Sequence, residues 1–123
     1  MKASERSSQI WAVLAWAARS RQNITYSQLA QATGAFTGGL GAWLEPIQSY
    51  CIINKLPPLT VLVVQQESGM PGSGFTGATA AELATAQARV YAFSWLEHGN
   101  PGAESLEQAA KQMPSNGVPN RDP

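Results

Sequence analysis

The residues with the most suggestive spacing are three glycines that follow an apolar, strand-like segment. They lie in the stretch QQESGMPGSGF, residues 65–75, with the spacing Gly69-x-x-Gly72-x-Gly74. A glycine-rich turn between a strand and a helix can bind phosphate through backbone amides. However, this spacing is not that of a dinucleotide-binding loop, no Gly-Lys-Ser/Thr follows it, and no lysine occurs between residues 56 and 110. We therefore favour a wing or a connecting turn over a nucleotide site.

The conventional pair of nucleophile and base that the composition offers is the single cysteine, Cys51, with the single histidine, His98. Cys51 falls on the apolar stripe of a predicted helix, where a free thiol usually acts as a small hydrophobe. His98 falls in the last turn of another predicted helix, where the helix dipole accounts for it. One cysteine excludes an internal disulfide and a cysteine-based zinc site. We expect no catalytic residues, no metal site and no cofactor.

Composition predicts one globular domain without strong attraction to polyanions. The 123 residues are 44% hydrophobic and 13% charged, with a formal net charge of zero. Residues 1–60 carry five cationic and two acidic side chains, whereas residues 61–123 carry three cationic and six acidic ones. The first residues are polar and the first apolar stretch is short, so we expect a cytoplasmic protein that does not enter a membrane.

The N-terminal half is predicted to contain three helices. Apolar residues at helical spacing indicate a helix over residues 8–20. Thr25 and Gln28 form a capping box for a short helix that Gly34 ends. A third helical region spans roughly residues 38–54, and Pro46 is expected either to kink it or to divide it in two. A short capped helix, a glycine turn and a further helix are typical of a helix–turn–helix.

The C-terminal half is predicted to contain a strand, the glycine-rich loop and helices. The run LTVLVV predicts a strand over residues 59–64, and a further short strand is expected near residues 74–77. A second capping box opens a long helix over residues 79–98, and residues 103–112 form one more short helix. The four tryptophans are expected to serve the core.

These elements predict an α+β, mainly helical fold with a winged-helix-like arrangement. It comprises three N-terminal helices including the helix–turn–helix, a short strand or hairpin with a glycine-rich wing, and a long C-terminal helix. Residues 1–112 form this single domain, and residues 113–123 form a polar tail.

Two segments resemble a known family. ITYSQLAQATG at residues 24–34, and LPPLTVLVV at residues 56–64 before a glycine-rich turn, resemble the C-terminal domain of DNA O6-alkylguanine alkyltransferases and alkyltransferase-like proteins. That family has a Tyr-Gly-x-Leu-Ala helix, a recognition helix, and a Pro-Cys-His-Arg-Val-Val strand before a glycine-rich wing. The resemblance covers about residues 10–78 and implies a winged-helix topology.

The active-site residues of that family are replaced in this chain. When Val63-Val64 are aligned with the family's paired valines, Thr60, Val61 and Leu62 stand where its cysteine, histidine and arginine belong. Because alkyl transfer needs a thiolate, we expect none. The family's intercalating arginine falls among Phe36, Gly38 and Gly39. Tyr26 matches the tyrosine implicated in turning out a base.

We therefore expect a small, non-enzymatic, winged-helix-like binding protein that acts on DNA or in regulation. The expected contacts are Tyr26, Gln28, Gln31, Thr33 and Thr37 on the helix–turn–helix, Arg19, Arg21 and Lys55 on phosphate, and Gly69, Met70, Pro71, Gly72, Ser73, Gly74 and Phe75 in the loop. The alternative is a protein-interaction module, such as a regulator or inhibitor from a phage or mobile element. A third hypothesis is a small enzyme or nucleotide binder that uses the glycine-rich loop. A dimer is compatible with the sequence.

Overall fold

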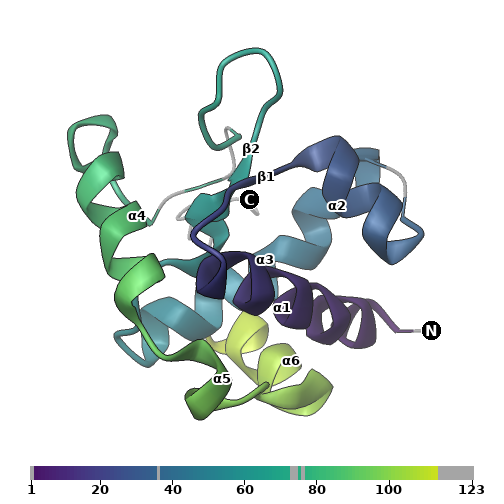
Figure 1. Cartoon of the computed structure of the whole chain (residues 1–123). Helices are drawn as coiled ribbons and strands as arrows, with labels where there is room; N and C mark the ends of the chain where they lie inside the picture. The colour runs from purple at the N-terminus through teal and green to yellow at the C-terminus, as the bar shows by residue number, and fades with distance from the viewer. Residues whose placement is uncertain (1, 36, 73–74, 76, 114–123) are drawn as a thin grey trace.

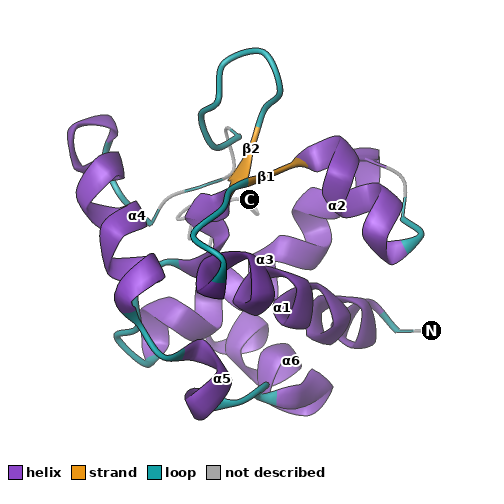
Figure 2. Ribbon diagram, viewed as in Figure 1, coloured by secondary structure: helices purple, strands orange, loops and turns teal. Residues whose placement is uncertain are grey.

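A computed structural model describes residues 2–35, 37–72, 75 and 77–113 of the protein. The chain is mainly helical with one small two-stranded parallel sheet, which confirms the expected α+β class (Figures 1 and 2). The helices are α1 (Ala3–Arg19), α2 (Tyr26–Thr33), α3 (Leu40–Ile53), α4 (Leu83–Ala92), α5 (Trp95–His98) and α6 (Gly102–Gln112). The strands are β1 (Ile24–Thr25) and β2 (Val63–Val64), and the 3-10 turns are η1 (Thr37–Gly39), η2 (Leu59–Leu62) and η3 (Ala80–Glu82). None of these helices has the length and apolarity that a membrane span requires.

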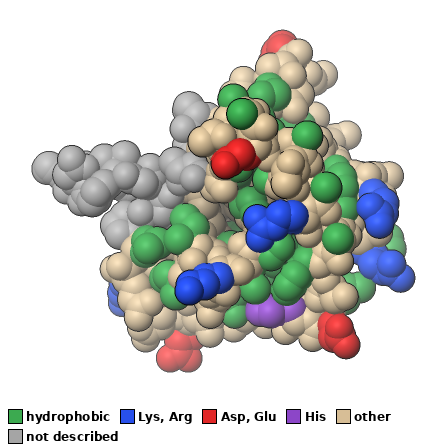
Figure 3. All heavy atoms as spheres, turned by 90° about the vertical axis from the view of Figure 1, so that its left-hand side faces the viewer, with side chains coloured by type: hydrophobic (Ala, Val, Ile, Leu, Met, Phe, Trp, Pro, Cys, Tyr) green, Lys and Arg blue, Asp and Glu red, His purple; other side chains and the backbone are tan. Residues whose placement is uncertain are grey.

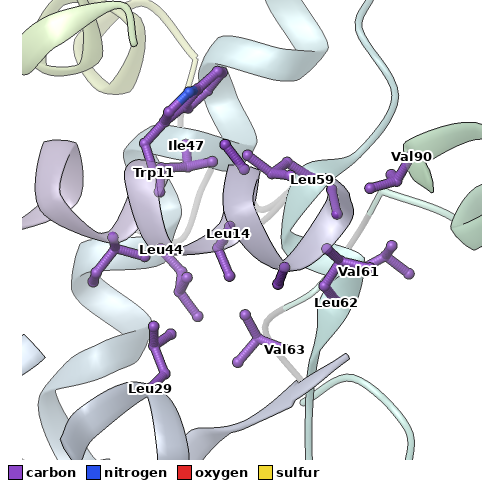
Figure 4. Close-up of a cluster of buried hydrophobic side chains, with 14 of the residues drawn as sticks. Trp11, Leu14, Leu29, Leu44, Ile47, Leu59, Val61, Leu62, Val63 and Val90 are labelled. Carbon is purple, nitrogen blue, oxygen red and sulfur yellow. The ribbon is translucent and has the colours of Figure 1, made fainter. Parts of the chain in front are cut away.

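Helix α1 forms the centre of the core. It packs against α3 and α6, which also pack against each other. Leu14 on α1 is fully buried and belongs to the same hydrophobic cluster as Leu44 and Ile47 of α3 and Leu59 of η2 (Figure 4). The apolar stripe predicted for the first helix is therefore the surface around which the rest of the chain folds.

Helix α1 begins at Ala3, five residues before the predicted start. The backbone N–H of Lys2 donates to the Glu5 carboxylate at 2.8 Å, and the Ser7 hydroxyl donates to the Trp43 carbonyl of α3 at 2.6 Å. Polar residues such as these could equally belong to a loop. Here, the Glu5 side chain provides a hydrogen-bond acceptor for a backbone N–H at the start of the helix, and the Ser7 side chain joins α1 to α3.

Helix α2 matches its prediction closely. Thr25 Oγ1 accepts from the Gln28 N–H at 3.1 Å, and Gln28 Oε1 accepts from the Thr25 N–H at 2.9 Å. Gly34 then adopts a left-handed conformation with φ of 74° and ends the helix. Both ends are fixed by contacts within a few residues, which explains why the sequence predicts them well.

Of the two outcomes expected at Pro46, a kink or a division of the third helix, the division is wrong, because α3 runs through this residue without a break. A proline leaves the carbonyl four residues earlier without its helical partner, and that residue is Ala42, which is exposed. Solvent can therefore satisfy the carbonyl, while the Pro46 ring itself is buried.

The strand predicted over residues 59–64 is shorter than expected, and the strand that pairs with it was not predicted. Residues Leu59–Leu62 form η2, in which the Val61 N–H donates to the Pro58 carbonyl at 2.9 Å, so that only Val63–Val64 are extended. β2 pairs in parallel with β1, with Ile24 opposite Val63. The further strand expected near residues 74–77 falls partly outside the described residues.

The predicted long helix over residues 79–98 is also wrong in its centre. Its capping box forms, with the Thr79 N–H donating to Glu82 at 3.0 Å. However, Phe93 is extended and separates α4 from α5. The break lets Trp95 turn inward, where its indole N–H donates to the Val90 carbonyl at 2.7 Å. Burial of this tryptophan therefore overrides the helical preference of the segment.

Candidate functional site

The glycine-rich loop forms a closed turn at the end of β2. Val64 and Pro71 form an antiparallel bridge, and the Gln65 N–H donates to the Met70 carbonyl at 2.8 Å. Gly69 closes the turn with φ of 70°, which favours glycine, and its N–H donates to the Gln65 carbonyl. Figure 1 shows the loop projecting away from the helices. Its exposed residues, 65–70, are thus held in a defined conformation.

Tyr26, the first residue of α2, holds this loop. Its side chain is half-buried, packs on the core, and meets Gly72 so closely that a Cβ on Gly72 would overlap the phenol oxygen. Burial raises the pKa of Tyr26, and a hydrogen bond from the Gly72 backbone opposes that rise. The expected base-contacting tyrosine is therefore engaged with the protein itself. We call the exposed side chains of α2 together with residues 65–72 the α2–loop surface.

Two of the expected contact residues on α2 already form hydrogen bonds with the backbone of their own segment. Gln28 is engaged in the capping box, and the Thr33 hydroxyl donates to the Leu29 carbonyl at 2.8 Å. Gln31 is exposed, as is Ser27, which was not among the expected contacts. Ser27 follows the capping residue by two positions, and its small polar side chain gave no signal of its own.

The 3-10 turn η1 and the first turn of α3 carry small side chains where a recognition helix would carry polar ones. Gly38, Gly41 and Ala42 are exposed, whereas Leu40 is buried. This end of the helix thus has no exposed side-chain donor or acceptor over those positions, and base edges are read by such groups. The side chain of Thr37, an expected contact, lies outside what the structure describes.

The cationic Arg6 lies beside α2 and α3, but its side chain already contacts both helices. Its guanidinium donates to the Thr33 carbonyl at 2.7 Å and lies 5.6 Å from the centroid of the Trp43 ring. It therefore joins α1, α2 and α3 and belongs to the structural framework.

The three expected phosphate contacts do not come together with α2. Arg19 and Arg21 line a cavity of about 660 Å³ whose other wall is the α4–α5 turn. Figure 1 shows α2 and α4 on opposite sides of the two strands. Lys55 follows the far end of α3, a helix of 14 residues, which is about 21 Å long at 1.5 Å per residue. The sequence therefore identified cations and polar residues that the fold keeps apart.

The last residues of the loop lead back toward the core. Phe75 is half-buried and packs on the core cluster. A Cβ on Gly77 would lie 2.7 Å from Pro58 Cβ and 2.9 Å from the Phe75 ring. Ser73 and Gly74, both expected contacts, lie outside the described residues.

Neither Cys51 nor Thr60 is placed for nucleophilic chemistry. Cys51 is buried, and desolvation raises the pKa of its thiol from 9.0 to about 12. Thr60 is buried as well, and its hydroxyl has no hydrogen-bond partner in the described part of the chain. The exposed His98 ring contacts Trp11, Tyr50 and Phe93. Within the same residues, no three His, Cys, Asp or Glu side chains gather as they would to hold a metal ion.

The buried thiol leads to a prediction about reactivity. In the folded protein, we expect Ellman's reagent to label Cys51 far more slowly than in urea, because the thiol is protonated and inaccessible at neutral pH. The folded protein keeps a proton that the unfolded chain releases. Stability should therefore be unaffected by this group below about pH 9 and should fall as pH rises toward 12.

Cys51→Ala should flatten that alkaline loss when unfolding is followed by circular dichroism against pH. Rapid labelling at neutral pH without denaturant would contradict the burial of the thiol.

Comparison with known proteins gave no significant match to a family model, to a curated protein or to a solved structure.

Proposed function

We propose that the protein is a small, non-enzymatic, winged-helix-like binding module that docks on a protein partner through the α2–loop surface. The observation that carries this proposal is the contact of Tyr26 with Gly72, which fixes the loop against α2. A surface that is ordered before binding loses less conformational entropy when a partner docks.

The composition of the α2–loop surface favours a protein over a polyanion. Its exposed side chains include the amides of Gln31, Gln65 and Gln66, the apolar Met70, and the acidic Glu67 at the tip of the loop. Methionine is enriched at protein interfaces, and uncharged polar groups surround such anchors. A carboxylate at the tip of a wing opposes approach to phosphates.

DNA is the second candidate, and one observation favours it. The small residues Gly38, Gly41 and Ala42 leave the start of α3 free to approach a nucleic-acid backbone closely. Because these side chains cannot read base edges, such binding would follow shape and charge and would vary little with sequence.

The proposal is tested with Met70→Asp and a matched control, Met113→Asp. Both methionines are exposed to a similar degree, 43% and 38%, but Met113 lies beyond α6. The tagged protein would be used to recover a partner from cells that produce it, and the purified pair would then be titrated by calorimetry. We expect Met70→Asp to weaken binding about tenfold or more, as for a buried interface anchor, and Met113→Asp to leave it unchanged.

A gel-shift series with duplex DNA, run at increasing salt, distinguishes the second candidate. Tight DNA binding with a steep salt dependence would replace the protein partner by DNA. Equal loss of partner binding in both methionine variants would refute the α2–loop surface as the docking site.

A further inference from the structure

A second surface, separate from the α2–loop surface, lies at the C-terminal end of α1. It is the cavity of about 660 Å³ between α1 and the α4–α5 turn, which we call the α1–α5 groove. Its walls combine the cationic Arg19 and Arg21 with the apolar Phe93 and Leu96, and Glu97 lies at the α5 side. Figure 3 shows this side of the molecule, where hydrophobic side chains are exposed among lysine and arginine side chains. The groove is large enough to receive several side chains of a ligand.

The two arginines of the groove have no carboxylate partner among the residues that the structure describes. The ion pairs formed by the described residues join Lys2 and Lys111 to Glu107, and Lys2 lies at the N-terminal end of α1, away from the groove. Arg21 lies near Tyr91, whose hydroxyl donates to Asn23 at 2.8 Å. The groove thus presents positive charge beside a tyrosine that is already held in place.

Arg21 occupies a position where glycine is usual. The Arg21 N–H donates to the Ala18 carbonyl and the Gln22 N–H to the Ala17 carbonyl, which is the Schellman pattern at a helix end. Arg21, which turns the chain there, has φ of 55°, a conformation that is unfavourable for residues other than glycine. Helix α3 ends in the same way at Lys55, also with φ of 55°, but outside the groove. The helix dipole explains a cation at the C-terminal end of each of these helices, but Arg21, unlike Lys55, lines the α1–α5 groove.

The apolar part of the groove is unusually exposed. Leu96, which lines the groove, is 61% exposed, and Trp16 of α1, which is not one of the lining residues, is 65% exposed. These are the most exposed of the large hydrophobic side chains in the described chain. The expectation that all tryptophans serve the core is therefore wrong for Trp16, because most of its side chain is exposed. Exposed apolar groups beside unpaired cations are typical of interaction sites.

The aromatic groups of the groove favour a protein segment over a nucleic acid. Stacking of bases needs free ring faces, but Trp95 is 2% exposed and its ring packs on Phe93 with centroids 4.4 Å apart. Carboxylates, by contrast, suit the planar guanidinium groups of arginine, and an aliphatic side chain suits Leu96.

We propose that the α1–α5 groove binds an acidic segment of a partner protein, with carboxylates on Arg19 and Arg21 and an apolar side chain against Leu96. Charge complementarity identifies the occupant, and the surface is independent of the one through which the proposed function acts.

Arg21→Gly and Lys55→Gly form a matched pair for the test. Each removes one cation from the same position of a Schellman motif and replaces it with the residue that the backbone prefers, so neither is expected to unfold the protein. The probe is a short fluorescent peptide in which Asp and Glu flank Leu and Phe, and binding is followed by fluorescence anisotropy. Its twin carries Asn and Gln in place of the acids, and a second twin carries Ser in place of Leu and Phe.

We expect the acidic apolar peptide to bind, with affinity falling as salt rises. Arg21→Gly should weaken binding about tenfold, the order expected when one partner of a charge pair is removed. Leu96→Ser should weaken it too, and Lys55→Gly should leave it unchanged. Both twin peptides should bind more weakly than the parent.

Several results would overturn the proposal. These are no measurable binding of the parent peptide, equal effects of the two glycine variants, full competition by single-stranded DNA of the same charge, or self-association that Arg21→Gly abolishes, which would make a second copy the occupant. Met70→Asp should not alter peptide binding, so failure here is distinguishable from failure of the α2–loop surface.

Discussion

Replacing Trp11 with alanine is expected to lower the free energy of unfolding by about 3–5 kcal/mol, as for other large-to-small substitutions of buried aromatic residues. Trp11 is 1% exposed and packs edge-on against Tyr50 and Trp95, with ring centroids 5.5 and 5.6 Å away. It therefore joins α1, α3 and α5, and its removal leaves a cavity that three elements cannot easily close. A domain of this size is stabilised by only about 5–15 kcal/mol, so the loss is a large fraction of the total.

The matched control is Trp16→Ala, on the same helix. Because the Trp16 side chain is 65% exposed, we expect its substitution to change stability by less than about 0.5 kcal/mol. Urea unfolding followed by circular dichroism measures the free energy of unfolding of both alanine variants. Trp11→Phe should cost less than Trp11→Ala, since it keeps most of the ring and removes an indole N–H that has no partner among the described residues. Equal stability of the two alanine variants would contradict the packing of α1.

Replacing Gly72 with alanine is expected to destabilise the protein by about 1–3 kcal/mol and to displace the loop from α2. The new methyl group would overlap the Tyr26 hydroxyl and lie 3.1 Å from Cζ of the same ring. Since the ring is packed on the core, the loop has to move. Under the proposed function, this variant should also lose partner binding.

Tyr26→Phe separates the clash from other effects of the substitution. Alone, it removes the hydrogen bond with Gly72 and should cost about 0.5–1.5 kcal/mol. In the double variant Tyr26→Phe/Gly72→Ala, the new methyl group no longer meets a hydroxyl. The combined loss of stability should therefore be smaller than the sum of the two single losses. Gly41→Ala is the control, because its added methyl group meets nothing within 4 Å and it lies within α3. It should stabilise the protein by up to about 1 kcal/mol. Destabilisation by Gly72→Ala that Tyr26→Phe does not reduce would contradict the contact.

The sequence by itself determined the elements whose ends are fixed locally. The capping boxes at Thr25 and Thr79 and the left-handed Gly34 each involve residues within a few positions of one another. The apolar stripe of α1 and the burial of Cys51 likewise follow from helical periodicity. The closed turn around Gly69 belongs to the same class, since glycine supplies the conformation that the turn needs.

Only the tertiary structure decided how distant segments meet. β1 is two residues long and exists because residues 63–64 lie beside it, so no local pattern could reveal it. The break at Phe93 depends on where Trp95 is buried, and the continuity of α3 depends on the exposed position of Ala42, four residues before Pro46.

The same holds for the functional residues. Tyr26 was a candidate for contact with a ligand, but it holds Gly72, which is 46 positions away in the chain. Arg19 and Arg21 looked like partners of α2, but the fold places them against α4 and α5. Side-chain types and local spacing fix what a residue is able to contact. Long-range packing decides which contacts it makes, because burial of apolar surface outweighs any single local preference.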